Sequence, residues 1–252
     1  MTKELEFRVI AETVGGVALD SAVLIYRGAN STAFAPVHPI HHDDAGAASI
    51  LPGRPMTMLA VARLAKRLGS ARRPGGFVPM NLLYQDLTTM AWWVPPARRH
   101  IWFRCTGGEL GAPERGESVP HPGLVFAATS DRTWRVWAVK GCDRPSEATP
   151  LFQAPYFNVY GTGAICQGNV DVPTGGFAGS VADRIEAWNK AFFDSFFTHP
   201  NTQGPLVNYK GGPYRFWRDM LDGRHAVVPE SALGPLGTSL AQLLDRRGPD
   251  GG

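Results

Sequence analysis

Residues 156–168, which read YFNVYGTGAICQG, decide how the rest of the chain is interpreted. Asn158 leads into a glycine-rich turn, and the turn presents one cysteine, Cys166. A cysteine held on such a loop can be reactive, because its thiolate is a nucleophile where solvent and polar groups reach it. Free cysteine is also among the most buried residue types, so a small packed side chain is the alternative. The stretch alone leaves both interpretations open.

The composition indicates a folded globular protein. The chain has 252 residues, of which 44% are hydrophobic and 19% are charged, and this balance argues against disorder. Its length suffices for one large domain or two small ones with a sizeable core. Lys and Arg number 25 against 22 Asp and Glu, which gives a net charge of +3. So small and dispersed a charge speaks against nucleic acid as a partner.

The sequence carries no sign of export, membrane insertion or a disulfide framework. Its first residues, MTKELE, hold no apolar stretch that could serve as a secretory signal. No run approaches the roughly 18 apolar residues of a membrane span. The three cysteines, Cys105, Cys142 and Cys166, are an odd number without CxxC spacing. We therefore expect a cytoplasmic protein without a cysteine-based zinc site.

Residues 38–44 (HPIHHDD) combine donor types that zinc or manganese accepts. The stretch reads as a polar loop that opens into small residues, and the next histidine along the chain is His100. A solvated loop tip is therefore the preferred interpretation. The sequence predicts no metal site and requires no other cofactor.

The N-terminal part alternates short apolar runs with turns. Residues 4–40 predict a three-stranded meander, since apolar and charged side chains alternate with a period of two. Residues 55–69 predict a helix that begins at Pro55, carries an apolar stripe and ends at Gly69. Residues 72–76 (RRPGG) form the connector that follows and are the best candidate boundary.

Residues 77–140 predict antiparallel sheet, because aromatic and β-branched residues dominate. The pattern predicts a hairpin of residues 88–94 with 100–104, a loop over residues 107–122, and a second hairpin of residues 124–129 with 133–139. The five tryptophans of this region are assigned to core packing. At strand spacing, with little positive charge nearby, they do not favour base stacking.

Beyond the cysteine, residues 180–197 predict a long helix with an aromatic face. Ser180 is the expected N-cap, with an acidic residue three positions on. The tripeptide at residues 199–201 (HPN) is interpreted as the stop signal of this helix. The tail predicts two short helices, at residues 213–221 and 238–247, and a frayed end.

The order of these elements resembles the ubiquitin-conjugating fold, in which a helix, a four-stranded antiparallel meander, a cysteine loop and a second helix follow one another. Residues 158–166 (NVYGTGAIC) resemble the local motif of that superfamily, an asparagine followed by a Gly-x-Ile-Cys ending. Standard enzymes carry His-Pro before the asparagine, whereas this chain has Tyr156 and Phe157.

The closer likeness is to the prokaryotic ubiquitin-conjugating-like family D, known as PRTRC system protein B. It covers roughly residues 55–200. Besides the cysteine loop it rests on HPGLVF at 121–126, the strand at 134–140, TPL at 149–151 and APYFNVY at 154–160. The resemblance implies two partners, a ThiF-like activating protein and a small ubiquitin-like protein, and a plasmid-borne, ParB-related bacterial cassette as the context.

The fold class implied by the resemblance is α+β, a ubiquitin-conjugating-like core with an extra N-terminal β-meander. The expected domains are a β-meander at residues 1–54 packed on the core, the ubiquitin-conjugating-like domain at residues 55–200, and a helical extension at residues 201–252.

The resemblance also implies a chemistry for the cysteine loop. Cys166 would carry the modifier as a thioester and pass it to an amine. The Asn158 amide would stabilise the tetrahedral oxyanion; asparagine in a turn also bonds its own backbone, and the two roles are compatible. Asp171 is the candidate to polarise the incoming amine. Four further residues are expected to shape the loop: Tyr156, Gly161, Gly163 and Ile165.

Three other functions fit parts of the sequence. A non-catalytic scaffold of the same fold is suggested by the missing His-Pro. A cysteine hydrolase would need a histidine base beside Cys166, for which His121 and His199 are the candidates. A nucleic-acid role in plasmid maintenance is suggested only by the cassette, and the near-neutral charge speaks against it.

Overall fold

The computed structural model describes residues 8–9, 19–27, 33–44, 46–57, 59–61, 77–86, 88–129, 133–167, 170, 172–173, 180–202 and 204–245 of the chain. The chain divides into two compact units, Met1–Gly76 and Phe77–Gly252. Each unit has its own sheets.

Unit 1 is built of short strands. They are β1 (Arg8–Val9), β2 (Ser21–Val23), β3 (Tyr26–Arg27), β4 (Ala33–Phe34), β5 (Pro36–His42), β6 (Ala48–Ile50) and β7 (Arg54–Pro55). One sheet has the order β1-β6-β5-β2, with β7 also paired to β5, and β3 pairs with β4. The extended structure predicted for residues 4–40 is confirmed where it is described, but the strands are shorter and more numerous than a three-stranded meander.

The helix predicted at residues 55–69 begins later than expected. Pro55 lies in β7. Helical backbone is present at residues 59–61, where the Ala60 N–H donates to Thr57 Oγ1 at 3.2 Å. Because such a bond marks an N-cap, the threonine starts the helix and the proline does not. The remainder of that prediction lies outside the described residues.

The histidine-rich stretch is mostly strand rather than a loop tip. His38 and His42 both lie on β5. The His38 ring donates from Nδ1 to the Leu51 carbonyl at 2.9 Å, and the His42 ring donates from Nε2 to the Leu19 carbonyl at 2.8 Å. Within the described ranges, no group of three or more His, Cys, Asp or Glu side chains could hold a metal ion.

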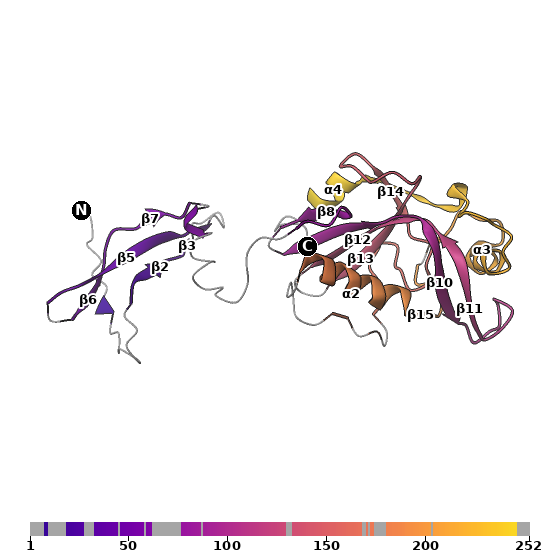
Figure 1. The fold of residues 1–252 in the computed structure, drawn as a ribbon, viewed down its shortest axis with the longest axis horizontal. Coiled ribbons are helices and arrows are strands. Elements are labelled where there is room, and N and C mark those ends of the chain that lie inside the picture. The colour runs from indigo at the N-terminus through magenta and orange to yellow at the C-terminus, as the bar shows by residue number, and fades with distance from the viewer. Residues whose placement is uncertain are drawn as a thin grey trace. The chain divides into compact units, whose positions relative to one another are not determined.

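Unit 2 contains nine strands among its described residues. They are β8 (Leu82–Gln85), β9 (Thr89–Val94), β10 (Ala97–Arg104), β11 (Glu114–His121), β12 (Gly123–Thr129), β13 (Trp134–Val139), β14 (Pro150–Gln153), β15 (Phe196–Phe197) and β16 (Pro235–Ser239). The main sheet is antiparallel, in the order β16-β14-β13-β12-β9-β8, and a smaller sheet has the order β11-β10-β15 (Figure 1). The predicted hairpin of residues 124–129 with 133–139 is confirmed as β12 with β13.

The main sheet is buried on both faces, because its strands are apolar on both sides. On one face, Trp92 and Phe126 stack at 5.3 Å, and Phe126 meets Phe192 of helix α2 (Val181–Phe193) edge-on at 5.1 Å. On the other face, Trp137 clusters with Leu240 of helix α4 (Leu240–Asp245). Figure 1 shows the two helices on opposite sides of the sheet.

Most of the tryptophans pack as predicted. Trp92, Trp134 and Trp137 are almost fully buried in the core. Trp102 differs, since 44% of it is exposed on the smaller sheet. The assignment to core packing is therefore right for these three and wrong for Trp102.

A pair of prolines bends one long ribbon through both sheets. Val94 pairs with Leu124 in the main sheet, and Ala97 pairs with His121 in the smaller one. Three residues separate these two pairs on each strand, so the pairing on both sides of the corner follows one continuous antiparallel register. Residues 95–96 (PP) lie at this corner, where the ladder is interrupted, because proline has no N–H to donate.

β9 and β10 follow one another along one strand of this ribbon, and they pair with β12 and β11 rather than with each other. The predicted hairpin between them is therefore wrong. The reversal comes at residues 105–113 instead, where the Cys105 N–H donates to the Pro113 carbonyl at 2.7 Å. The loop predicted at residues 107–122 is wrong over β11. That strand reads ERGESVPH, and its glycine, serine and proline are residue types typical of turns, whereas strands are usually rich in β-branched and aromatic residues.

Helix α2 starts as predicted and ends early. The Asp183 N–H donates to Ser180 Oγ at 3.1 Å, and the Ser180 N–H donates to the Asp183 carboxylate at 3.2 Å, which completes a capping box. The C-cap is Asp194. The two phenylalanines that follow form β15, which runs parallel to β10. The tripeptide at residues 199–201 comes after β15 and does not stop the helix.

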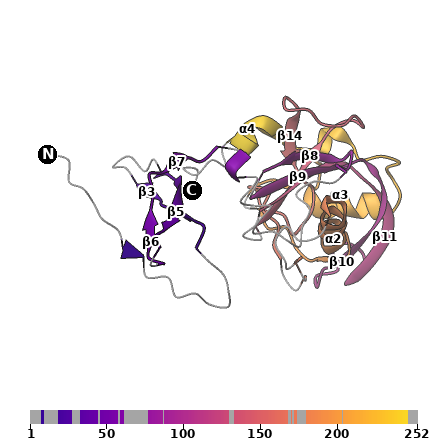
Figure 2. The same ribbon diagram turned by 60° about the vertical axis from the view of Figure 1, so that its left-hand side comes forward.

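The C-terminal segment completes the core of unit 2. Helix α3 (Gly212–Leu221) confirms the helix predicted there, and it lies against β11 (Figure 2). Its Trp217 is fully buried and donates from Nε1 to the Pro155 carbonyl at 2.6 Å. A 3-10 turn (Glu230–Ala232) and β16 lead into α4, the second predicted helix. The frayed end lies outside the described residues. No helix that the structure describes is long and apolar enough to cross a membrane.

Candidate active site

A short two-stranded ribbon holds the cysteine loop against the main sheet. Val159 and Ile165 face each other in an antiparallel bridge, and both side chains are buried. The Ile165 N–H donates to the Trp134 carbonyl at 3.2 Å, and the Val136 N–H donates to the Gly163 carbonyl at 2.8 Å. The loop is thereby bonded to β13, and Ile165 is its anchor.

The turn of this ribbon needs glycine at one of the two predicted positions. Gly163 has a φ of 80°, in the left-handed region, and its N–H donates to the Tyr160 carbonyl at 2.8 Å. A Cβ at Gly163 would lie 2.4 Å from Trp137 Nε1, so a larger residue would collide with the core. A Cβ at Gly161 would meet no atom within 4 Å. The fold therefore requires glycine at Gly163 but not at Gly161.

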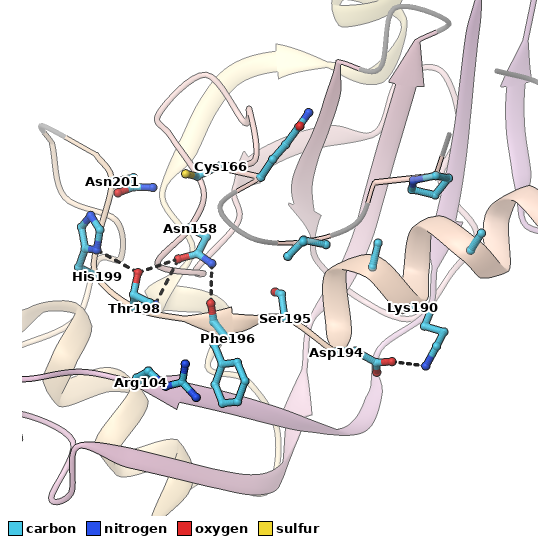
Figure 3. Close-up of a pocket in the computed structure, with 15 residues that line it drawn as sticks. Arg104, Asn158, Cys166, Lys190, Asp194, Ser195, Phe196, Thr198, His199 and Asn201 are labelled. Carbon is cyan, nitrogen blue, oxygen red and sulfur yellow. Dashed lines mark hydrogen bonds and ion pairs between the residues drawn. The ribbon is translucent and has the colours of Figure 1, made fainter. Parts of the chain in front are cut away.

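Cys166 lines a cavity of about 800 Å³ at the end of this ribbon. Its side chain is partly exposed, and its N–H donates to the Asn158 carbonyl at 2.8 Å. Figure 3 shows the sulfur beside the Asn201 side chain. The same cavity is lined by residues from the loop, β10, α2 and its C-cap, β15 and the segment that follows β15. Among them are Arg104, Asn158, Lys190, Asp194, Phe196, Thr198, His199 and Asn201.

The other two cysteines lie in different surroundings. Cys105 is buried, and its thiol donates to the Thr198 carbonyl at 3.1 Å. Burial, and then the Glu109 carboxylate, raise the pKa of Cys105 to about 11, so it stays a thiol near neutral pH. Cys142 is exposed but lines a separate cavity. Cys166 is therefore the cysteine that combines access with a place on the predicted loop.

Asn158 is tied to β15 through its side chain. Its Nδ2 donates to the Phe196 carbonyl at 2.8 Å, and its Oδ1 accepts from the Thr198 N–H at 3.2 Å and the Thr198 hydroxyl at 3.5 Å (Figure 3). The amide thus takes the place of a neighbouring strand at the free edge of β15. The second N–H of Nδ2 has no bond within the described part of the chain and can still donate.

Tyr156 fixes the start of the loop in the core. It is fully buried, and burial raises the pKa of its hydroxyl. The hydroxyl and His121 Nδ1 form a hydrogen bond of 2.7 Å. Burial, and then the Arg99 guanidinium, lower the pKa of His121 to about 3, so the ring is neutral. His121 is buried and lines the Cys142 cavity rather than the Cys166 cavity, which removes it as a candidate base.

Sequence reasoning missed Asn201 and named His199 only as a candidate base for a cysteine hydrolase. His199 and Asn201, from the tripeptide interpreted as a helix stop, both line the cavity with Cys166. The Asn201 N–H donates to the Phe157 carbonyl at 3.0 Å, which fixes the tripeptide beside the cysteine loop. The tripeptide was the only feature of the sequence that could have drawn attention to these residues, because periodicity does not indicate contacts between segments as distant as the cysteine loop and residues 199–201. Asp171 lies outside the described residues, so its role stays a prediction.

The charged side chains around the cavity are paired. Arg104 forms an ion pair with Glu114 at 2.7 Å, and its guanidinium lies 4.0 Å from the centre of the Phe196 ring. Lys190 pairs with Asp194 one helical turn away. Exposed pairs of this kind contribute at most about 1 kcal/mol each. Among the described residues that line the cavity, these charges therefore occur as oppositely charged pairs.

Comparison with known families decides the identification. The model of prokaryotic E2 family D matches residues 58–236. The chain belongs to this family. No curated protein and no solved structure gives a match.

The family match fits the molecule at a coarse level. The family D chain is α+β, with mostly antiparallel sheets and few helices, which is compatible with a ubiquitin-conjugating-like fold. The matched range includes the whole Cys166 loop and extends past residue 200, to β16. The residues expected to form a separate C-terminal extension therefore fall largely within the family's range.

Proposed function

We propose that this family D protein relays a ubiquitin-like modifier through a thioester on Cys166. The observation that carries the proposal is the setting of the thiol, which is partly exposed at a cavity while its backbone is bonded to a rigid ribbon. A nucleophile that must meet two different proteins in turn needs access and a fixed position together.

The relay needs no oxidant, metal or organic cofactor of its own. The Cys166 thiolate attacks the carbonyl carbon of a thioester on a ThiF-like activating protein, a new C–S bond forms, and the activating protein's thiolate leaves. A neutral amine of the acceptor then attacks the same carbon, loses a proton, and expels the Cys166 thiolate. Each step passes through a tetrahedral oxyanion, and losing one positioned donor to such an oxyanion costs about 100- to 1000-fold in rate.

Two amides are available to act as that donor. Asn158 faces Cys166 across the ribbon and keeps one N–H unused by the described residues. Asn201 lines the same cavity, and Figure 3 shows its side chain next to the sulfur. We assign Asn158 both the structural bonds to β15 and the oxyanion role.

The proposal is tested by loading. Full-length protein is incubated with ATP, the ThiF-like protein and the small ubiquitin-like protein of the same cassette, and run on non-reducing and reducing gels. We expect a reductant-sensitive adduct that Cys166→Ala abolishes. The matched controls Cys105→Ala and Cys142→Ala should keep it. An adduct that persists in Cys166→Ala would overturn the assignment.

One alternative gains support from the structure. His199 lines the Cys166 cavity, with Nδ1 at 3.0 Å from Thr198 Oγ1, so an imidazole is present for a cysteine hydrolase. The same reaction separates the candidates. Release of free modifier that depends on His199 favours the hydrolase, transfer to an amine favours the relay, and an inert Cys166 favours a non-catalytic scaffold.

A further inference from the structure

A chain of hydrogen bonds leads from the cysteine loop to the ring of His199 (Figure 3). It begins at Asn158, whose amide lies between a backbone carbonyl and a backbone N–H. Nδ2 donates to the Phe196 carbonyl at 2.8 Å, and Oδ1 accepts from the Thr198 N–H at 3.2 Å, which fixes the orientation of the amide. Because Oδ1 can only accept, the Thr198 hydroxyl, 3.5 Å away, donates its single hydrogen to it.

The same hydroxyl sets the tautomer of His199. Nδ1 of the ring lies 3.0 Å from Thr198 Oγ1. The hydroxyl hydrogen is directed at Asn158, so the oxygen offers the ring a lone pair, and Nδ1 supplies the hydrogen. The neutral ring then carries its proton on Nδ1, and Nε2 keeps a lone pair. Within the described part of the chain, no hydrogen bond uses Nε2.

His199 and Cys166 face the same cavity without being bonded to each other. Both line the cavity of about 800 Å³, and His199 is exposed there. The hydrogen bond from the Asn201 N–H to the Phe157 carbonyl holds the His199 segment beside the cysteine loop. Among the described residues, no hydrogen bond joins the ring to the sulfur. The lone pair of Nε2 is therefore available to a third group that enters the cavity.

The other charged or basic side chains of the cavity are already engaged. Asp194, which could also accept a proton, is ion-paired with Lys190. Arg104, which cannot serve as a base, is paired with Glu114. Among the described residues that line the cavity, His199 is thus the neutral nitrogen base.

We propose that His199 is a catalytic residue of the relay, which accepts the proton that the acceptor amine loses during discharge. As the amine nitrogen bonds to the thioester carbon, the nitrogen becomes positively charged and its hydrogens become acidic. One of them passes to His199 Nε2, the C–S bond breaks, and its electron pair leaves with the Cys166 sulfur as the thiolate. The exposed imidazolium then returns the proton to water. The role rests on the proposed function, since discharge is its second half.

The choice of nucleophile separates this role from an architectural one. Amines and thiolates form the same kind of tetrahedral intermediate at the same carbon, so both need the oxyanion donor. A thiolate has no proton to lose, and the loss of a base does not slow its attack. General-base catalysis contributes about 100- to 10,000-fold. We expect an effect of about 100-fold here, at the low end, because a thiolate is a good leaving group.

The test uses full-length protein with Cys142→Ser, so that the exposed thiol of Cys142 does not react. Cys166 is acetylated with S-acetyl mercaptoethanesulfonate, the excess reagent is removed, and the modified site is assigned by peptide mass. Release of the acetyl group is followed with lysine and, separately, with mercaptoethanesulfonate, and release in buffer alone is subtracted. His199→Gln removes the base. The matched control is His100→Gln, at an exposed histidine of β10 outside the cavity.

We expect His199→Gln to slow release by lysine about 100-fold and to leave release by the thiolate unchanged. His100→Gln should leave both rates at those of the parent. Equal slowing of the two reactions in His199→Gln would overturn the proposal, as would slowing of neither or a Cys166 that takes no acetyl group.

The tautomer is tested separately. Long-range proton–nitrogen NMR spectra at alkaline pH, where the ring is neutral, should show the His199 hydrogen on Nδ1. Thr198→Val keeps the branched shape and removes the hydroxyl. It should abolish this preference and slow release by lysine about 2- to 10-fold, the contribution of one hydrogen bond. A hydrogen on Nε2 in the parent would overturn the proposal.

Because an acetyl group replaces the modifier, these outcomes are independent of the loading assay. A His199-dependent transfer to lysine in a protein that takes no modifier would retain the base and refute the relay. A modifier thioester that forms on Cys166, combined with a transfer to lysine that is independent of His199, would retain the relay and refute the base.

Discussion

At the scale of the residue, the buried imidazole of His121 sets how unit 2 responds to acid. Its pKa of about 3 in the folded protein lies well below the ordinary value of 6.5, chiefly because burial disfavours the charged ring. Between these two values the unfolded chain binds a proton that the folded chain does not. The free energy of unfolding is therefore greatest above pH 6.5 for this group and falls as the pH drops toward 3.

We expect His121 to remove about 2 kcal/mol from the free energy of unfolding between pH 7 and pH 5, at about 1.4 kcal/mol per pH unit below its ordinary pKa. His121→Gln keeps a polar side chain beside Tyr156 and cannot titrate, so it should lose less stability over that interval. Urea unfolding across this pH range measures the difference. The exposed variant His199→Gln is the control and should keep the parent slope. Equal slopes in the parent and His121→Gln would show that the buried ring is not the titrating group.

At the scale of the element, β15 depends on one side chain for its outer edge. The strand has two residues and pairs with β10 on one side. On the other side, Asn158 accepts from the Thr198 N–H and donates to the Phe196 carbonyl. A strand of two residues forms few backbone hydrogen bonds. The two bonds from the Asn158 side chain therefore contribute strongly to keeping β15 paired with β10. The position of β15 in turn sets the wall of the Cys166 cavity.

Asn158→Ala should therefore release β15 as well as remove a donor. Leaving a partly buried carbonyl and N–H without partners costs about 1–3 kcal/mol. We expect faster hydrogen exchange at the Thr198 amide. We also expect the substitution to slow discharge to an amine more than it slows loading. Asn201→Ala is the matched control, at the same cavity, and should leave Thr198 exchange unchanged. If Asn158→Ala slows loading and discharge equally, Asn158 acts through the architecture alone.

Local signals were sufficient where an element is fixed by its own residues. Ser180 predicted the start of α2, since a capping box lies within four residues of sequence. The hairpin of β12 and β13 also followed from pattern. The sequence pattern failed to predict β11, because its turn-type and polar residues form a strand only through their pairing with β10. It failed for Asn201 as well, because β15 and the cavity arise only when segments forty residues apart meet. His199 was named as one of two candidate bases, and it does line the cavity.

At the scale of the whole molecule, the boundary between the two compact units, after Gly76, differs from the start of the family match, at residue 58. The buried hydrophobic core, counted over the described residues, is drawn from Met90 to Leu240 and so lies within unit 2. The C-terminal helices belong to that core, with Phe216 and Trp217 fully buried. The family match begins at residue 58, inside unit 1. Residues 58–76 thus lie inside the range that the family model matches but outside the compact unit that holds the described core.

We expect residues 77–252 to fold without unit 1, because burial of apolar surface dominates stability and the described core is complete within this range. A fragment of residues 77–252 should unfold in one cooperative transition and show the same rate of Cys166 alkylation as the full chain. A fragment of residues 58–252 is the matched control and should be no more stable in urea. If only the longer fragment unfolds cooperatively, residues 58–76 complete the core and the family boundary is the physical one. The same result would place the start of the folded body near Thr57, the N-cap of the helical residues 59–61.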